Sequence, residues 1–215
     1  MTDPARPAAL VPDPAVADDG IRLRPFRPAD TAAVVRLAGL CLGQGYITDL
    51  APILARPGLV FVVAEAAGGK DGDGGVAGFV FGWRLEPSDL AALYPELKAA
   101  QVAHLVGSVG ETAQLGILKT IAVDPGCQGR GLGARLMAAC LDRLAADGAT
   151  ALVVPAWIID GRVNLGPLLD RAGLPPIAAL TRPWQADCDS GAMVCPARTD
   201  RCRCDLRFHA GPLRR

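Results

Sequence analysis

A run of strand-forming residues ends in a glycine-rich turn that opens a long amphipathic helix, and this junction constrains the fold more than any other feature. The run ends at Val123 and is stopped by Asp124-Pro125-Gly126. Glycines follow at 129, 131 and 133, and apolar residues then recur at helical spacing: Leu136, Met137, Cys140, Leu141 and Leu144. This order predicts a strand, a tight turn and a packed helix that ends near Ala146.

The same junction has the properties of an anion site. Amide N–H groups at a helix start have no partner within the helix, and the helix dipole adds about half a positive charge there. Glycines let the backbone approach a ligand closely. The segment Gln128–Gly133 therefore favours phosphate or pyrophosphate, although a glycine-rich turn without a ligand has the same pattern. Its G-x-G-x-G spacing differs from the dinucleotide fingerprint, and no Lys-Ser or Lys-Thr closes it as in a Walker loop.

Charge and composition exclude several classes of protein. The chain has 22 basic residues (Lys and Arg) and 22 acidic residues (Asp and Glu). It therefore lacks the basic excess of a nucleic-acid-binding protein. No segment approaches the ~20 apolar residues of a membrane span, and the first twenty residues hold four prolines and four aspartates but no signal-peptide core. The seven cysteines are then expected to be reduced in a cytoplasmic protein that contacts neither membrane nor nucleic acid.

Periodicity predicts an α/β (α+β) fold, a mixed sheet flanked by helices. We expect a disordered tail over residues 1–20, one main domain over 21–184, and a cysteine-rich segment over 185–215 that closes the sheet. Strands are expected at 21–26, 59–64, 76–85, 112–123, 149–157 and 203–209. One helix is expected to follow Asp30, which can serve as its N-cap. Another is expected to begin within 129–133 and to end near 146, and further helical segments are expected at 47–55, within 86–110 and at 162–172.

The glycine-rich junction resembles a known signature. Gln128-Gly129-Arg130-Gly131-Leu132-Gly133 is similar to the acetyl-CoA motif Q/R-x-x-G-x-G/A of the Gcn5-related N-acetyltransferases. This resemblance implies a splayed sheet whose gap admits the pantetheine arm of acetyl-CoA as co-substrate. It also implies a cofactor-binding set in which backbone near the first two residues bonds pantetheine and the rest hold the pyrophosphate: Ile121, Val123, Gln128, Gly129, Arg130, Gly131, Leu132, Gly133 and Ala134.

The resemblance leaves the catalytic residues unassigned. Leu169 stands in the place where relatives often have a tyrosine acid, and Asn164 lies about two residues from their asparagine position. Glu111, before a strand, and Asp160, after one, are candidates for a general base, although surface carboxylates of this kind are more often merely solvated. The histidines, His104 and His209, fit packing or surface roles. We expect the three tryptophans to pack in the core.

Lys119 stands within the strand that precedes the junction, where relatives sometimes have glutamate. A cation at this position suits an acidic group on the acceptor or a salt bridge, and it does not suit deprotonation of an amine.

Four of the seven cysteines gather near the C-terminus: Cys188, Cys195, Cys202 and Cys204. Reduced thiols so close together are suited to a structural zinc ion, although the usual C-x2-C knuckle is absent. A hairpin of free thiols fits the same spacing, so no metal site is assigned.

The leading hypothesis is an N-acetyltransferase whose acceptor, a small-molecule or peptide amine, attacks acetyl-CoA directly. The alternative is a non-catalytic acyl-CoA-binding regulator on the same fold. A third hypothesis is a zinc-linked interaction module attached to either. A homodimer is compatible with the sequence.

Overall fold

The computed structural model describes residues 20–66, 75–110, 112–197 and 202–213. Its strands are β1 (Ile21–Pro25), β2 (Val60–Ala66), β3 (Val76–Leu85), β4 (Leu115–Val123), β5 (Ala151–Ile159), β6 (Arg162–Val163), β7 (Pro176–Leu180) and β8 (Asp205–Pro212). The α-helices are α1 (Thr31–Leu42), α2 (Ala51–Leu54), α3 (Pro87–Leu93), α4 (Ala99–Gly107), α5 (Leu132–Ala146), α6 (Gly166–Ala172) and α7 (Gln185–Asp189). Short 3-10 turns, η1 (Pro28–Asp30) and η2 (Pro125–Cys127), precede α1 and α5.

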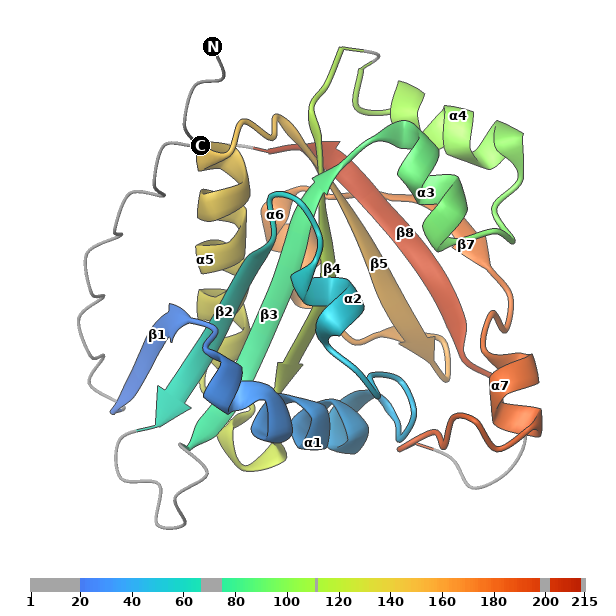
Figure 1. Ribbon diagram of the computed structural model, residues 1–215. Helices are drawn as coiled ribbons and strands as arrows, with labels where there is room; N and C mark the ends of the chain where they lie inside the picture. Colours follow the sequence, from blue (N-terminus) through green and yellow to red (C-terminus); the bar gives the residue numbers. More distant parts are fainter. Residues whose placement is uncertain (1–19, 67–74, 111, 198–201, 214–215) are drawn as a thin grey trace, which may run out of the picture.

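All of these strands belong to one sheet in the order β1-β2-β3-β4-β5-β8-β7, with β6 paired to β5 (Figure 1). Neighbouring strands are antiparallel except β4 and β5, which are parallel. The predicted mixed α/β fold is confirmed. The strand predicted over 203–209 is β8, which lies inside the sheet between β5 and β7.

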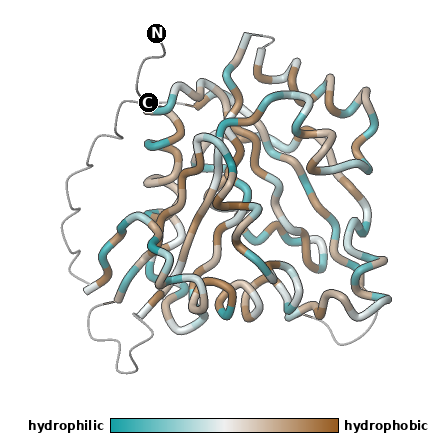
Figure 2. The backbone as a smooth tube through the Cα atoms, in the orientation of Figure 1, coloured by the Kyte–Doolittle hydropathy of each residue, from teal (hydrophilic) through white to brown (hydrophobic). Residues whose placement is uncertain are grey.

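Two apolar clusters hold helices on opposite faces of the sheet. Alternate residues of β3 divide between them: Phe79, Phe81 and Trp83 join the cluster of α1, α3 and α4, whereas Val80 joins that of α5 and α6. The apolar stripe predicted for α5 is largely buried, and the helix packs on β2, β3 and β4 (Figure 1). In Figure 2 the hydrophobic colour recurs along the central strands, as a sheet covered on both faces requires.

Several element boundaries differ from the sequence prediction. Residues 162–172 do not form one helix, because Arg162 and Val163 form β6 and α6 begins at Gly166. The short helix α7 was not predicted, since five polar and small residues carry no periodic signal. The predicted tail, residues 1–20, lies outside the described residues except for Gly20.

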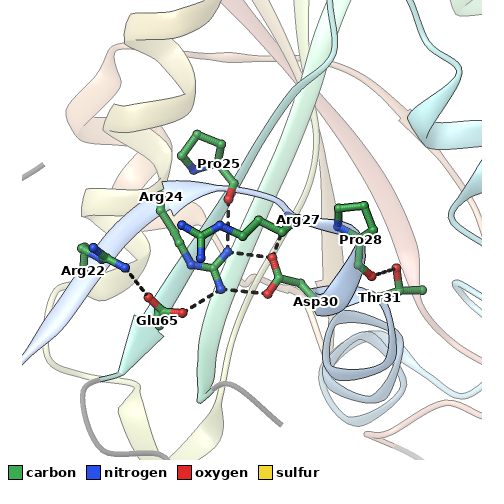
Figure 3. A network of polar contacts seen from close by, with 8 residues as sticks. All are labelled: Arg22, Arg24, Pro25, Arg27, Pro28, Asp30, Thr31 and Glu65. Carbon is green, nitrogen blue, oxygen red and sulfur yellow. Dashed lines mark hydrogen bonds and ion pairs between the residues drawn. The ribbon is translucent and has the colours of Figure 1, made fainter. Parts of the chain in front are cut away.

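Asp30 occupies the N-cap position of α1, but its side chain makes no cap hydrogen bond. Its carboxylate instead accepts two hydrogen bonds from the Arg24 guanidinium, at 2.7 and 2.8 Å (Figure 3). Arg24 also donates to Glu65 at 2.8 Å and is only 3% exposed. The network lowers the pKa of Glu65 to about 2 and ties β1, β2 and the start of α1 together.

We expect Arg24→Met to destabilise the fold by about 3–5 kcal/mol, because it leaves the buried Asp30 carboxylate without its cation. Arg22→Met is the matched control, because Arg22 pairs with the same Glu65 but its side chain is 30% exposed. Its expected cost is about 0–1 kcal/mol. Urea unfolding measures both, and equal small losses would contradict a structural role for the network.

Candidate functional site

The sheet opens between β4 and β5. The two strands pair only over three residues each, Leu115 to Ile117 of β4 with Ala151 to Val153 of β5. Beyond these pairs β5 continues beside β8, while β4 continues beside β3. Pro155 lies where β5 pairs with β8 and no longer with β4, and it has no N–H to offer a neighbour. The gap that the family resemblance implied is therefore present between these strands.

A bulge in β4 stands at this opening. Phe81 of β3 lies opposite Thr120, and the next residue, Gly82, lies opposite Leu118, so Lys119 is the extra residue. A Cβ on Gly82 would collide with the carbonyl of Ile117, so the close approach of the strands here requires glycine. Bulges re-aim side chains, and Lys119 lines a cavity at the opening.

The cavity has a volume of about 290 Å³. Its walls come from residues of β4, β5 and β8, the loop after α1, the loop between α3 and α4, and α7 with its flanks. They include both tyrosines of the chain and two of its three tryptophans: Tyr46, Tyr94, Trp157 and Trp184. The indole rings of Trp157 and Trp184 meet edge-to-face, with centroids 5.6 Å apart. Only two carboxylates, Glu96 and Asp187, line the cavity among the described residues.

Two tyrosines surround Lys119. Its Nζ lies 5.1 Å from the centroid of the Tyr94 ring and 5.7 Å from that of Tyr46. The Tyr46 hydroxyl lies 3.3 Å from Oγ1 of Thr120. The buried Tyr94 hydroxyl makes no regular hydrogen bond to another described residue, although it interacts with Lys119. Burial raises the pKa of Tyr94, so this hydroxyl is neutral at physiological pH.

The glycine-rich loop follows the C-terminal end of β4. Gly129 and Gly131 have φ values of 74° and 81°, and a Cβ on either would meet nothing within 4 Å. Among hydrogen bonds between described residues, the N–H groups of Gly129, Arg130 and Gly131 have no partner. The loop is exposed, and Gln128 closes its base by donating from Nε2 to the Val123 carbonyl at 2.9 Å. Open amides beside positive-φ glycines fit an anion such as a pyrophosphate.

Partly exposed residues of β4 connect the two features. Lys119, Ile121 and Val123 alternate with the buried Thr120 and Ala122. Ile121 lines the cavity, and Val123 approaches the start of α5, since a Cβ on Gly133 would lie 3.8 Å from it. The loop and the cavity therefore lie along one strand, at the place where the sheet opens.

Comparison with known protein families identifies the family to which this chain belongs. Residues 43–158, more than half of the chain, match the acetyltransferase (GNAT) family. The protein belongs to the GNAT family. The sequence itself matches no curated protein.

Solved GNAT structures share the fold. The ribosomal-protein-S18-alanine N-acetyltransferase from Escherichia coli superposes with a TM-score of 0.58 at 14% identity, covering 91% of this chain and 95% of that one. An agmatine N-acetyltransferase gives 0.57 at 16% identity, covering 89% and 99%. Ard1 from Thermoplasma volcanium gives 0.54 at 17% identity, covering 91% and 99%. At these identities the likeness establishes the fold.

Of the predicted base candidates, the one that the structure describes does not line the cavity. Glu111 lies outside the described residues. Asp160 is exposed in the turn between β5 and β6, with φ of 51°, and it does not line the cavity. His104 is exposed on α4. His209 is buried in β8, with Nδ1 at 2.9 Å from the Leu174 carbonyl. Leu169 is fully buried, whereas Asn164 lines the cavity.

The predicted core packing of the tryptophans is confirmed for Trp83 and in part for Trp184, which is half-buried against the same cluster. Trp157 and Trp184 also form part of the cavity wall. Tyr46 and Tyr94 were not singled out. Their scarcity was a usable signal, because tyrosine and tryptophan combine apolar area with a polar group and recur in binding sites.

The four C-terminal cysteines come together in the structure. The Sγ atoms of Cys195 and Cys204 are 3.9 Å apart, and Cys188 interacts with Cys202. Burial and the neighbouring thiols raise the pKa of Cys188 to about 11 and that of Cys204 to about 12. Across the described part of the chain, no three Cys, His, Asp or Glu side chains are arranged to hold a metal ion. The zinc hypothesis stays a prediction.

No helix in the described ranges is long and apolar enough to cross a membrane.

Proposed function

We propose that this GNAT protein is an N-acetyltransferase that transfers the acetyl group of acetyl-CoA to an amine held in the cavity. The observation that carries the proposal is the continuity along β4, from the open amides at Gly129 to Gly131 to the cavity at Lys119. A pyrophosphate site just beyond the C-terminal end of β4 and a cavity beside the middle of the same strand match the two ends of a long acyl-CoA molecule.

Residues of the chain divide the binding work. The amides of the segment Gln128–Gly133 would hold the pyrophosphate, with Ala134 behind them, and backbone groups near Ile121 and Val123 would hold the pantetheine amides. The edge of β4 that faces β5 has such groups available beyond Ile117, because the two strands no longer pair there. When bound, acetyl-CoA supplies a thioester carbonyl and a thiolate leaving group.

Direct attack by the amine is favoured over a cysteine-bound intermediate. Burial raises the pKa of Cys41, whose Sγ donates to the Val123 carbonyl at 3.4 Å. Cys204, which interacts with Trp157 at the cavity wall, also has a raised pKa. A thiol must ionise to become a nucleophile, and these thiols are protonated at neutral pH.

The acceptor amine needs help to lose its proton. An amine with a pKa near 10.4 is neutral in only about one molecule in ~2,500 at pH 7. This costs roughly 4–5 kcal/mol unless a base or desolvation assists. The thiolate of CoA, with a pKa near ~8.5 like that of cysteine, leaves without comparable assistance. A base therefore matters more than an acid, and we propose that one of the two cavity carboxylates serves.

A screen of amines with acetyl-CoA tests the proposal through the thiol that each turnover releases. We expect thiol release well above the acceptor-free rate for at least one class of amine. We propose a cytoplasmic location for this activity, where acetyl-CoA is available and thiols stay reduced. Tight acetyl-CoA binding with no turnover across amino acids, polyamines, aminoglycosides and peptides would instead favour the non-catalytic regulator.

A further inference from the structure

Lys119 is a cation inside the cavity without a carboxylate partner. The ion pairs among the described residues join Arg22, Arg24, Asp30 and Glu65, all at the far edge of the sheet, and none includes Lys119. Glu96 and Asp187 line the same cavity, but neither lies within 4.0 Å of Nζ. Both acids are exposed.

An ammonium in such a place is expensive to keep. Lys119 is only partly exposed. Withdrawing a charge from water costs free energy unless it is paired, and the faces of Tyr46 and Tyr94 compensate only in part. Burial by itself lowers the pKa of Lys119, but interactions with the two tyrosines outweigh it and raise that pKa. Lys119 is therefore charged at neutral pH and across the mildly alkaline range.

The backbone is built to hold Lys119 in this position. Lys119 is the extra residue of the β4 bulge. Only glycine fits at position 82 of the facing strand, because a Cβ there would collide with β4. The bulge lies where β4 and β5 separate, which is where the acetyl group would arrive under the proposed function. A regular strand would place residue 119 differently, so the bulge positions the Lys119 side chain at the cavity.

We propose that Lys119 binds a carboxylate of the acceptor, and that the acceptor is therefore a small acid that also carries the amine, of the amino-acid class. The carboxylate would give Lys119 the ion-pair partner that no described residue supplies, while the cationic amine would face Glu96 and Asp187. A cavity of about 290 Å³ lies at the small end of ligand pockets and suits a compact acceptor.

This inference rests on the proposed function and names its substrate class. It also separates Lys119 from catalysis. An ammonium cannot accept the proton of the amine, so Lys119 acts on selection of the acceptor and on its position. The expected signature lies in KM for carboxylated acceptors, and kcat should change much less.

The test compares free amino acids with their carboxamides as acceptors, in wild type and in Lys119→Met. Wild type should prefer the acid by about 10- to 100-fold in kcat/KM, the range for hydrogen bonds to charged groups. Lys119→Met should lose this preference through a higher KM for acids, and Lys119→Arg should retain most of it. The control is Lys98→Met, the same change at an exposed lysine outside the cavity, with no expected effect. Comparing ratios between variants cancels the different intrinsic reactivities of acid and amide.

Binding of N-acetylated amino acids, the products, gives a readout that needs no turnover. Quenching of Trp157 and Trp184 fluorescence should report weaker binding to Lys119→Met than to wild type, with no such difference for the N-acetylated carboxamides. The inference would be overturned, and the acetyltransferase proposal left intact, if wild type and Lys119→Met turned over amines with the same ratio of kcat/KM between acids and carboxamides. Absence of turnover with every amine would instead count against the proposed function.

Discussion

Replacing Gly131 with valine is expected to weaken acetyl-CoA binding at least 100-fold in a protein that still folds. Gly131 has φ of 81° at the N-cap of α5, and its surroundings are open. A β-branched side chain at positive φ is strained, and the loop would shift its amides away from the pyrophosphate. Two charge-assisted hydrogen bonds, each worth about 1.5–3 kcal/mol, account for a loss of roughly this size. Calorimetric titration with acetyl-CoA measures the affinity.

Gly148→Val is the matched control for this experiment. Gly148 follows the opposite end of the same helix, with φ of 92° and equally open surroundings. Its backbone strain should be similar, so the two variants should lose similar stability, but Gly148→Val should bind acetyl-CoA like wild type. If Gly131→Val kept wild-type affinity while folded, the loop would not be the pyrophosphate site.

Loss of the general base is expected to lower the rate by ~10²–10⁴ at neutral pH while acetyl-CoA binding is retained. We expect this result for Asp187→Asn. Asp187 lines the cavity from α7, and its carbonyl accepts a hydrogen bond from Met193 at 3.0 Å, which fixes the end of the helix. Glu96 lines the cavity from a loop, a less precise support for a catalytic group. Higher pH should partly rescue Asp187→Asn, because more of the amine is then neutral in solution.

Asp160→Asn is the control, because it removes an exposed carboxylate outside the cavity, and its rate should equal that of wild type. A silent Asp187→Asn with a slow Glu96→Gln would move the role to Glu96. Glu111→Gln belongs in the same set, since Glu111 stays a prediction from sequence alone. If all four variants had wild-type rates, deprotonation would depend on desolvation and positioning, without a carboxylate base.

Local patterns predicted much of the fold. The helix α5 was predicted almost to the residue, because its apolar stripe, the glycines before it and Gly148 after it are signals within one short segment. The strand β3 was predicted over its full length for a similar reason, as ten strand-forming residues lie between polar turns. The loop over Gln128–Gly133 was recognisable for the same reason: one turn of chain contains the whole motif.

The cavity could not be predicted in this way. Its aromatic residues come from four separate segments, at Tyr46, Tyr94, Trp157 and Trp184, and only the assembled sheet brings them together. Similarly, the local sequence predicted that the Asp30 side chain caps a helix. In the structure Asp30 instead accepts hydrogen bonds from Arg24 of β1, which also donates to Glu65 of β2. Long-range contacts decided these positions, and no local pattern records them.

The central claim, direct acetyl transfer from acetyl-CoA to an amine, is tested most directly by mixing the protein with acetyl-CoA, with and without the amine panel. Released thiol and the intact mass of the protein are then followed through the first turnover. The account predicts no acetylated protein and no burst of thiol without acceptor, and one thiol per N-acetylated product with it. A stoichiometric burst with an acetyl group on a cysteine would contradict direct transfer.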